Sequence, residues 1–166
     1  MSRIDETRPF IPVRIAVLTV SDTRTEKTDK SGALLAGMIA ETGHKIAEQA
    51  IVEDDPKAVR RQVKRWIKDP EIDVVITTGG TGFTGRDITP EAVKPLFEKE
   101  IEGFSALFHM LSYQKVGTST IQSRATAGVV KAGAVFCIPG SPNAAKLALT
   151  QIIIPELGHI ISHIRK

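Results

Sequence analysis

The sequence is poor in the residues that carry most redox, metal and covalent chemistry. It has a single cysteine, Cys137, within the apolar run Ala134–Ile138, which favours a buried core residue over a reactive thiol. One cysteine cannot form an internal disulfide. No Gly-x-Ser-x-Gly elbow is present to support a serine nucleophile. The histidines lack metal-ligand spacing, so we interpret all of them as structural or surface residues: His44, His109, His159 and His163.

Aromatic side chains and long apolar runs are also scarce. Aromatic residues make up 5% of the chain, which leaves little for stacking on nucleic-acid bases. The net charge is 22 − 19 = +3, a mild excess that permits an anionic ligand. The basic stretch 57–68 is interpreted as the solvated face of an amphipathic helix, with nucleic-acid binding as the alternative. We therefore expect no nucleic-acid partner.

No apolar run approaches the roughly 18 residues of a membrane span. No secretory signal follows Met1–Glu6, so we expect a cytoplasmic protein without a membrane partner. Residues 1–12 contain Pro9 and Pro12 and are expected to form an N-terminal arm. Residues 13–166 are expected to form a single domain, since domains commonly span about 100–200 residues.

Within that domain, strand and helix patterns alternate. Strands are expected over β-branched or apolar stretches at 13–20, 45–52, 72–77 and 135–138. Helices are expected at 31–42 and 56–68, from Thr89, over the stripe at 104–111, and from Pro142, with Pro155 interrupting the last of them. This alternation predicts an α/β fold with helices covering a mainly parallel sheet. The stripe at 104–111 and the run 152–154 are either core or an oligomer interface.

Ligands in such folds bind beyond the carboxyl ends of the strands, so the segments that follow each strand are the candidates for a site. Thr78–Gly82 reads Thr-Gly-Gly-Thr-Gly, and such glycines let the backbone approach a ligand and hold phosphate through N–H groups. A purely structural turn is the alternative. Ser141-Pro142 opens a helix, either as a cap alone or as an anion site.

Carboxylates follow the same strands. Asp22, Asp54, Asp55 and Asp87 facing a phosphate loop would require a cation, and Mg²⁺ is commonly held by one or two carboxylates plus phosphates. Each has a competing role. Asp55 precedes Pro56 and is expected to cap a helix, Asp22 could close a turn, and Asp87 could pair with its neighbour Arg86. Asp54 has no evident capping role, which favours a functional one.

These motifs together resemble a known family. Thr78–Gly82, followed by Gly85–Ala92, closely resembles the signature of the molybdenum cofactor biosynthesis protein B family, which includes the molybdopterin adenylyltransferases. Thr19–Asp22, Ser123–Gly128 and Ile138–Pro142 resemble other loops of that family. The resemblance implies a doubly wound, mainly parallel sheet with helices on both faces, assembled as a homotrimer or homohexamer.

The resemblance also implies an activity. The expected reaction is Mg²⁺-dependent adenylyl transfer from ATP to the terminal phosphate of molybdopterin, giving adenylated molybdopterin and pyrophosphate. A downstream metal-insertion protein would be a partner. The alternative is a non-catalytic molybdopterin-binding or scaffolding homologue, which the intact aspartates disfavour.

By the same resemblance, residues fall into three groups. Asp54 and Asp87 match the essential aspartates and would hold Mg²⁺. Asp55 stays the alternative match to Asp54, because Glu53 stands where adenylyltransferases of the family often have proline. The nucleotide- and phosphate-binding residues would be Ser21, Asp22, Thr78, Gly79, Gly80, Thr81 and Gly82. The pterin-binding residues would be Ser123, Arg124, Pro139, Gly140, Ser141 and Pro142.

Overall fold

The computed structural model describes residues 7–166. The first half of the expected N-terminal arm, residues 1–6, lies outside the described residues. Residues 7–12 contain no helix or strand, yet they contact the body of the protein. The Phe10 ring lies 4.9 Å from the His44 ring, and Arg8 Nη1 lies 2.9 Å from Nδ1 of His159.

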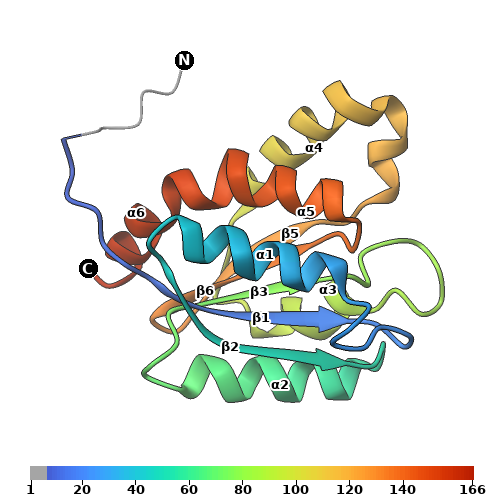
Figure 1. Ribbon diagram of the computed structural model, residues 1–166, viewed down its shortest axis with the longest axis horizontal. Coiled ribbons are helices and arrows are strands. Elements are labelled where there is room, and N and C mark those ends of the chain that lie inside the picture. The colour runs from blue at the N-terminus through green and yellow to red at the C-terminus, as the bar shows by residue number, and fades with distance from the viewer. Residues whose placement is uncertain (1–6) are drawn as a thin grey trace.

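A six-stranded mixed sheet forms the centre of the protein, in the order β2-β1-β3-β6-β5-β4 (Figure 1). The strands are β1 (Arg14–Val20), β2 (Lys45–Val52), β3 (Val74–Thr78), β4 (Lys99–Glu100), β5 (Thr126–Val130) and β6 (Gly133–Ile138). β2, β1, β3 and β6 are parallel, whereas β5 and β4 pair antiparallel at one edge. The chain reverses its order between β1 and β3, which is the topological switch point where such sheets bind ligands.

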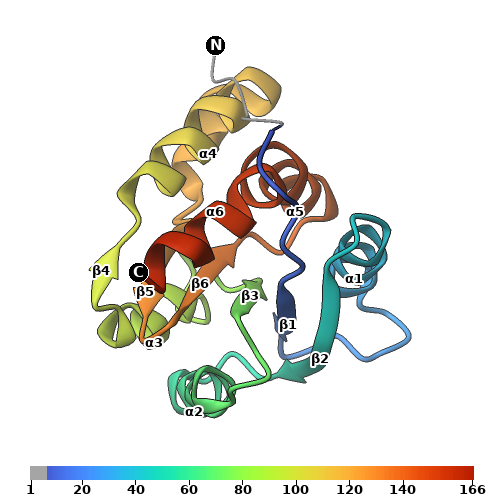
Figure 2. The same ribbon diagram turned by 90° about the vertical axis from the view of Figure 1, so that its left-hand side faces the viewer.

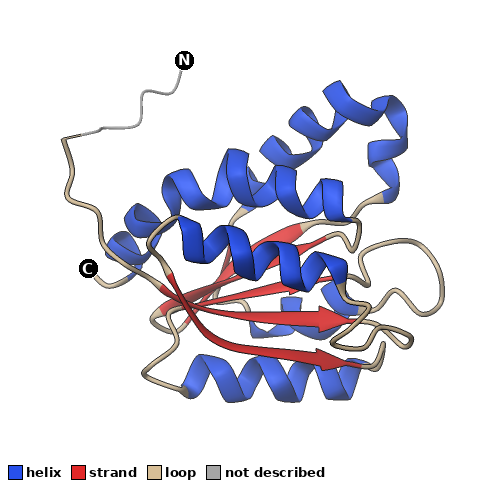
Figure 3. Ribbon diagram, viewed as in Figure 1, coloured by secondary structure: helices blue, strands red, loops and turns tan. Residues whose placement is uncertain are grey.

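Helices cover both faces of the sheet (Figures 2 and 3). One layer contains α1 (Lys30–Glu41), α4 (Glu102–Val116), α5 (Pro142–Ala148) and α6 (Ile154–Ile164), and the other contains α2 (Pro56–Lys68) and α3 (Thr89–Val93). Alternate residues of β1 enter the two cores, because successive side chains of a strand point to opposite faces. Ile15 and Val17 pack with the first layer, and Ala16 and Leu18 with the second.

Local signals explain where α2 begins and which face it buries. Asp55 caps it by accepting from the N–H groups of Lys57 and Ala58, and Pro56 starts it. Its apolar side chains Val59 and Val63 are buried against the sheet, while most of its basic side chains face outward. The capping role predicted for Asp55 and the amphipathic interpretation of this helix are confirmed.

Most expected elements appear within a few residues of their predicted bounds, but the antiparallel edge was not predicted. Ser123–Gly128, expected as a loop, ends inside β5. A side chain on Gly128 would collide with the Phe97 ring, so glycine is required at the place where Phe97 covers β5. A short connection follows, in which Lys131 has a φ of 53°, and the chain returns along β6.

Pro155 does not end the C-terminal helix. A π-helical turn, η3 (Leu149–Ile153), joins α5 to α6, and Pro155 lies in the first turn of α6, where its missing N–H costs little. The combined helix Pro142–Ile164 has 23 residues and contains an 18-residue window with a mean hydropathy of 1.3, so by length and composition it could cross a membrane. Leu149, Ile153 and Leu157 are fully buried in the core, as in a core helix.

At the amino ends of the strands, a buried carboxylate joins distant parts of the chain. Asp73 is 5% exposed and accepts from Arg14 Nε at 3.1 Å and from Arg165 Nη2 at 2.6 Å. Burial alone would raise the pKa of Asp73, but hydrogen bonds from both arginines outweigh it and lower the pKa to about 2. The C-terminus is thereby fixed to β1 and β3.

Replacing Asp73 with asparagine is expected to lower the free energy of unfolding at pH 7 by about 2 kcal/mol. Because the pKa is depressed, this stabilisation is present above the ordinary value of 3.8 and is lost as the pH falls towards about 2. Urea unfolding at several pH values should therefore show that the difference in free energy of unfolding between Asp73→Asn and wild type becomes smaller in acid. Glu71→Gln, which removes an exposed partner of Arg14, is the control and should change stability little. An Asp73→Asn gap that is independent of pH would contradict this account.

Candidate functional site

The glycine-rich segment after β3 makes a sharp turn at the carboxyl edge of the sheet (Figure 1). Gly79 and Gly80 have φ values of 103° and 72°, a region that side-chain-bearing residues rarely adopt. The N–H of Gly79 donates to the Ile138 carbonyl at 3.0 Å. That N–H is therefore not available to a phosphate. By contrast, no group in the described residues accepts a hydrogen bond from the N–H of Gly80 or Thr81.

Side-chain hydroxyls fix this turn to its neighbours. Thr89 Oγ1 donates to the Gly79 carbonyl at 2.8 Å, and Thr78 Oγ1 donates to the Pro139 carbonyl at 2.9 Å. Ser31 Oγ on α1 donates to the Gly140 carbonyl at 2.7 Å. These hydroxyl groups thus hold the loops after β3 and β6 together.

Asp22 and Asp54 form a reciprocal pair. The N–H of Asp22 donates to Asp54 Oδ2 at 2.9 Å, and the N–H of Asp54 donates to Asp22 Oδ1 at 3.0 Å. The loops after β1 and β2 are joined in this way. Burial and the neighbouring negative charge of Asp22 raise the pKa of Asp54, and Asp87 adds to the repulsion.

Arg86 pairs with Asp22 and not with Asp87, so the alternative that Asp87 is the partner of its sequence neighbour is wrong. Arg86 Nε and Nη2 each lie 2.9 Å from one oxygen of Asp22. These hydrogen bonds from Arg86 lower the pKa of Asp22. Adjacent residues in a tight loop point in different directions, so the arginine reaches back across the site.

Asp87 is held instead by its own loop. Its Oδ2 accepts from the N–H of Thr84 at 2.8 Å and from Thr84 Oγ1 at 2.7 Å. Burial would raise the pKa of Asp87, but these hydrogen bonds and one from the N–H of Gly82 lower it. Arg124 supports the same loop by donating to the Gly82 and Asp87 carbonyls, both at 2.9 Å, and by pairing with Glu91.

The glycine loop has an acidic side chain against each end. A side-chain carbon on Gly80 would lie 3.4 Å from Asp54 Oδ1, and one on Gly82 would lie 2.8 Å from Asp87 Oδ2. Glycine at 82 therefore allows Asp87 to approach the backbone, whereas at Gly80 the collision would be with Thr89 Oγ1 and Asp54 would be only in ordinary contact. Within residues 7–166, no group of three or more His, Cys, Asp or Glu side chains is arranged to hold a metal ion.

A cavity of about 1030 Å³ opens beside this loop, between the ends of α4 and α5. The expected site residues that line it are Gly80, Thr81, Gly82, Asp87, Ser123, Pro139, Gly140 and Ser141. Thr120 and Ser123 carry buried hydroxyl oxygens there that lack a hydrogen-bond partner among the described residues. Such buried groups are costly when they are left without a partner.

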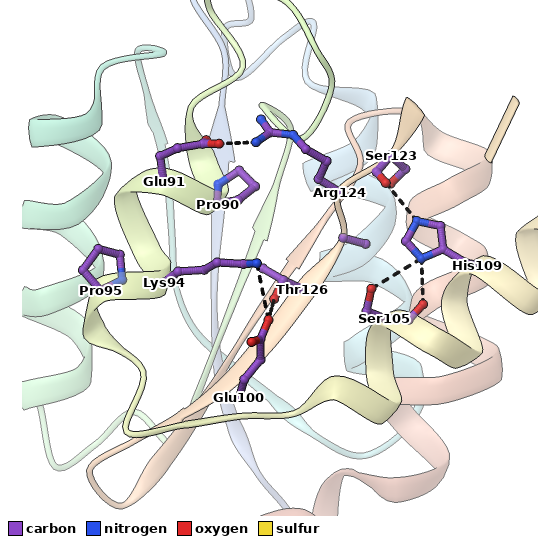
Figure 4. Close-up of a pocket in the computed structure, with 11 residues that line it drawn as sticks. Pro90, Glu91, Lys94, Pro95, Glu100, Ser105, His109, Ser123, Arg124 and Thr126 are labelled. Carbon is purple, nitrogen blue, oxygen red and sulfur yellow. Dashed lines mark hydrogen bonds and ion pairs between the residues drawn. The ribbon is translucent and has the colours of Figure 1, made fainter. Parts of the chain in front are cut away.

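A second cavity, of about 730 Å³, lies on the other side of Ser123 and Arg124 (Figure 4). Its charges are paired within the protein, with Lys94 Nζ 3.4 Å from Glu100 Oε1. Both ring nitrogens of His109 lie 2.8 Å from carbonyl oxygens, one of Ser105 and one of Ser123. His109 thus fixes the Ser123 segment to α4, which fits its interpretation as a structural residue.

Several expected site residues do not line the large cavity. Ser21 Oγ accepts from the N–H groups of Thr23 and Arg24 and so shapes its own turn. Ser141 does line the cavity, and it also caps α5 by accepting from the N–H of Ala144. The other expected site residues that are not part of its lining are Asp22, Asp54, Thr78, Gly79, Arg124 and Pro142.

Sequence reasoning missed two lysines that line the cavity, Lys115 and Lys146. They are isolated cations on helices, and no motif surrounds them, so only the packing of α4 beside α5 reveals them. Two of the residues that the sequence analysis interpreted as structural, Cys137 and His44, are buried as expected. Cys137 is fully buried, which raises its pKa to about 12, and His44 is buried and accepts from the N–H of Val13.

Comparisons with known proteins agree with this arrangement. Residues 16–159 match a protein family described as "Probable molybdopterin binding domain". Molybdenum cofactor biosynthesis protein B of Bacillus subtilis is 51% identical over 155 residues, covering 93% of this chain and 91% of that protein.

Solved structures of similar proteins have the same fold. A crystal structure of molybdenum cofactor biosynthesis protein B superposes with a TM-score of 0.91 at 46% identity, covering 95% of this chain and 98% of that one. The tungsten cofactor synthesizing protein of Pyrococcus furiosus gives 0.85 at 41% identity, covering 93% and 98%. The chain belongs to the molybdenum cofactor biosynthesis protein B family.

Proposed function

We propose that this protein is a cytoplasmic, Mg²⁺-dependent molybdopterin adenylyltransferase. The terminal phosphate of molybdopterin attacks the α-phosphorus of ATP, a new P–O bond forms, and the bond to the β-phosphate breaks to release pyrophosphate. The observation that carries the proposal is the glycine loop with Asp54 against Gly80 and Asp87 against Gly82, beside a cavity of about 1030 Å³.

The residues present fit a magnesium ion. Mg²⁺ prefers oxygen ligands and is commonly held by one or two carboxylates plus substrate phosphates. Asp54 and Asp87 supply hard oxygen atoms from two different loops, and their mutual repulsion helps to raise the pKa of Asp54. When bound, the ion would neutralise charge on the phosphates. Asp54 and Asp87 are the residues we assign to hold it.

The chain's own groups supply positioning and charge. The N–H groups of Gly80 and Thr81, which have no partner among the described residues, are assigned to the nucleotide phosphates. Lys115 and Lys146 bring positive charge to the cavity, which suits two phosphorylated substrates. No side-chain base is required, because the attacking phosphate is already an anion.

The pterin is assigned to the far part of the same cavity. Ser123, Gly140 and Ser141 line it, together with the partnerless hydroxyl of Thr120. A pterin ring offers several hydrogen-bond donors and acceptors, which suits a cavity lined by polar side chains and backbone groups. Arg124 supports this pocket through the backbone of the glycine loop, not through direct contact.

Asp87→Asn tests the activity. It should leave the fold intact, because an amide oxygen can still accept from Thr84, but turnover should fall about 10²-fold or more since a site charge is lost. The measurement is formation of adenylated molybdopterin and pyrophosphate from molybdopterin, ATP and Mg²⁺. Asp55→Asn is the matched control, because asparagine caps a helix as well as aspartate does, and it should retain wild-type turnover.

Two results would contradict the proposal. Full activity in Asp87→Asn would remove this carboxylate from the reaction. A wild-type protein that binds molybdopterin but forms no product would instead be a non-catalytic molybdopterin-binding protein, and any handover to a metal-insertion partner would then involve unmodified cofactor.

We also propose that the protein is a homotrimer or homohexamer with α4 at a subunit interface. Leu107, Met110, Tyr113 and Val116 are 46–59% exposed along α4, and Ile121 is 70% exposed in the 3₁₀ helix η2 (Gly117–Gln122). Exposed apolar groups clustered on one segment are typical of an interface. By contrast, Ile152 and Ile153 are buried, so that part of the run 152–154 belongs to the core.

Met110→Glu should therefore reduce the mass measured by sedimentation, because a charge at an apolar interface is costly to bury. Lys64→Glu, on the exposed face of α2, is the control and should leave the mass unchanged. An unchanged mass for Met110→Glu would place the interface elsewhere. Val116 lines the candidate cavity, so loss of the oligomer should also weaken substrate binding.

A further inference from the structure

Arg86 lies among acidic side chains that come from two other loops. Its guanidinium group holds both oxygens of Asp22, and the negative charges of Asp54 and Glu53 add to the attraction. Asp22 is in turn locked to Asp54 through reciprocal backbone hydrogen bonds. The arginine is therefore the nearby cation that balances the charge at Asp22 and Asp54.

This ion pair is exposed, which makes it easy to exchange. The Arg86 side chain is 65% exposed and that of Asp22 is 35% exposed. Exposed pairs contribute little to stability, because water solvates the separated charges almost as well. Arg86 also belongs to the same loop as the glycine turn, so a small rotation about its side-chain bonds can redirect the guanidinium group without moving the backbone.

We propose that Arg86 is an exchangeable counter-ion of the site. Without metal and nucleotide it neutralises Asp22 and Asp54. When the metal ion takes over that role, the arginine is released and binds the nucleotide phosphates, whose geometry its planar fork matches. This inference rests on the proposed function and assigns to Arg86 a role in binding order: the metal–nucleotide complex is bound more readily than free metal.

The exchange predicts effects of opposite sign in Arg86→Gln. Free metal should bind several-fold more tightly, because its competitor is gone, whereas ATP with Mg²⁺ should bind about tenfold more weakly, because a phosphate ligand is lost. Mn²⁺ binding without nucleotide can be followed by the electron paramagnetic resonance of the free ion. Nucleotide binding can be followed by calorimetry on the intact protein.

Arg65→Gln is the matched control. Arg65 Nη2 pairs with Glu48 at 2.9 Å, and its side chain is 61% exposed, but it lies on α2 away from the site. It should change neither affinity. Arg86→Lys keeps the positive charge but loses the fork, so it should restore the weak binding of free Mn²⁺ and only part of the nucleotide affinity.

A loss of both affinities in Arg86→Gln would overturn the exchange and leave Arg86 as a purely structural support for the acids. Unchanged affinities would also overturn it. The two proposals fail separately: opposite shifts in a protein that makes no adenylated molybdopterin would keep the exchange and reject the transferase.

Discussion

The carboxyl edge of the sheet depends on how closely the backbone at Gly79 approaches two neighbouring segments. A side-chain carbon on Gly79 would collide with the Val20 carbonyl at the end of β1, and one on Gly140 would lie 3.3 Å from Gly79 Cα. Gly79 also donates to Ile138 at the end of β6. One residue thereby brings together the ends of β1, β3 and β6. Any side chain there would separate the loops that carry the acids and line the cavity.

Much of the fold could be predicted because its signals are local. The bounds of β2 and α2 follow from apolar spacing and from the Asp55-Pro56 cap, and those elements end where predicted. The antiparallel edge could not be predicted in the same way. β4 has only two residues, and β5 depends on the fit of Gly128 beneath Phe97, a contact between segments distant in sequence. Pro155 marks the interruption of the C-terminal helical region as predicted, but the interruption is a π-helical turn and not an end of the helix, which the sequence did not show.

The candidate site, like the fold, could be predicted from the sequence only in part. The sequence places acids and glycines after the parallel strands, and the fold brings them to one edge, as the position of a switch point requires. The sequence does not show which charged side chains pair with one another. Asp22 and Asp54 are joined through backbone N–H groups, which leave no trace in residue type, and Arg86 turns from its neighbour Asp87 to Asp22. Lys115 and Lys146 reach the cavity only because α4 and α5 meet there.

A site built from carboxylates and backbone groups has a particular electrostatic constraint. Three acids on neighbouring loops repel one another, and this repulsion adds to burial in raising the pKa of Asp54. Removing that charge by substitution would also remove the attraction for a cation, so the repulsion has to be balanced by a group that can leave. A buried arginine would be costly to displace, whereas an exposed one can be displaced with little loss of stability. In the exchange that we propose, the 65% exposure of the Arg86 side chain would let the fold persist without a metal while the acids stay accessible to one.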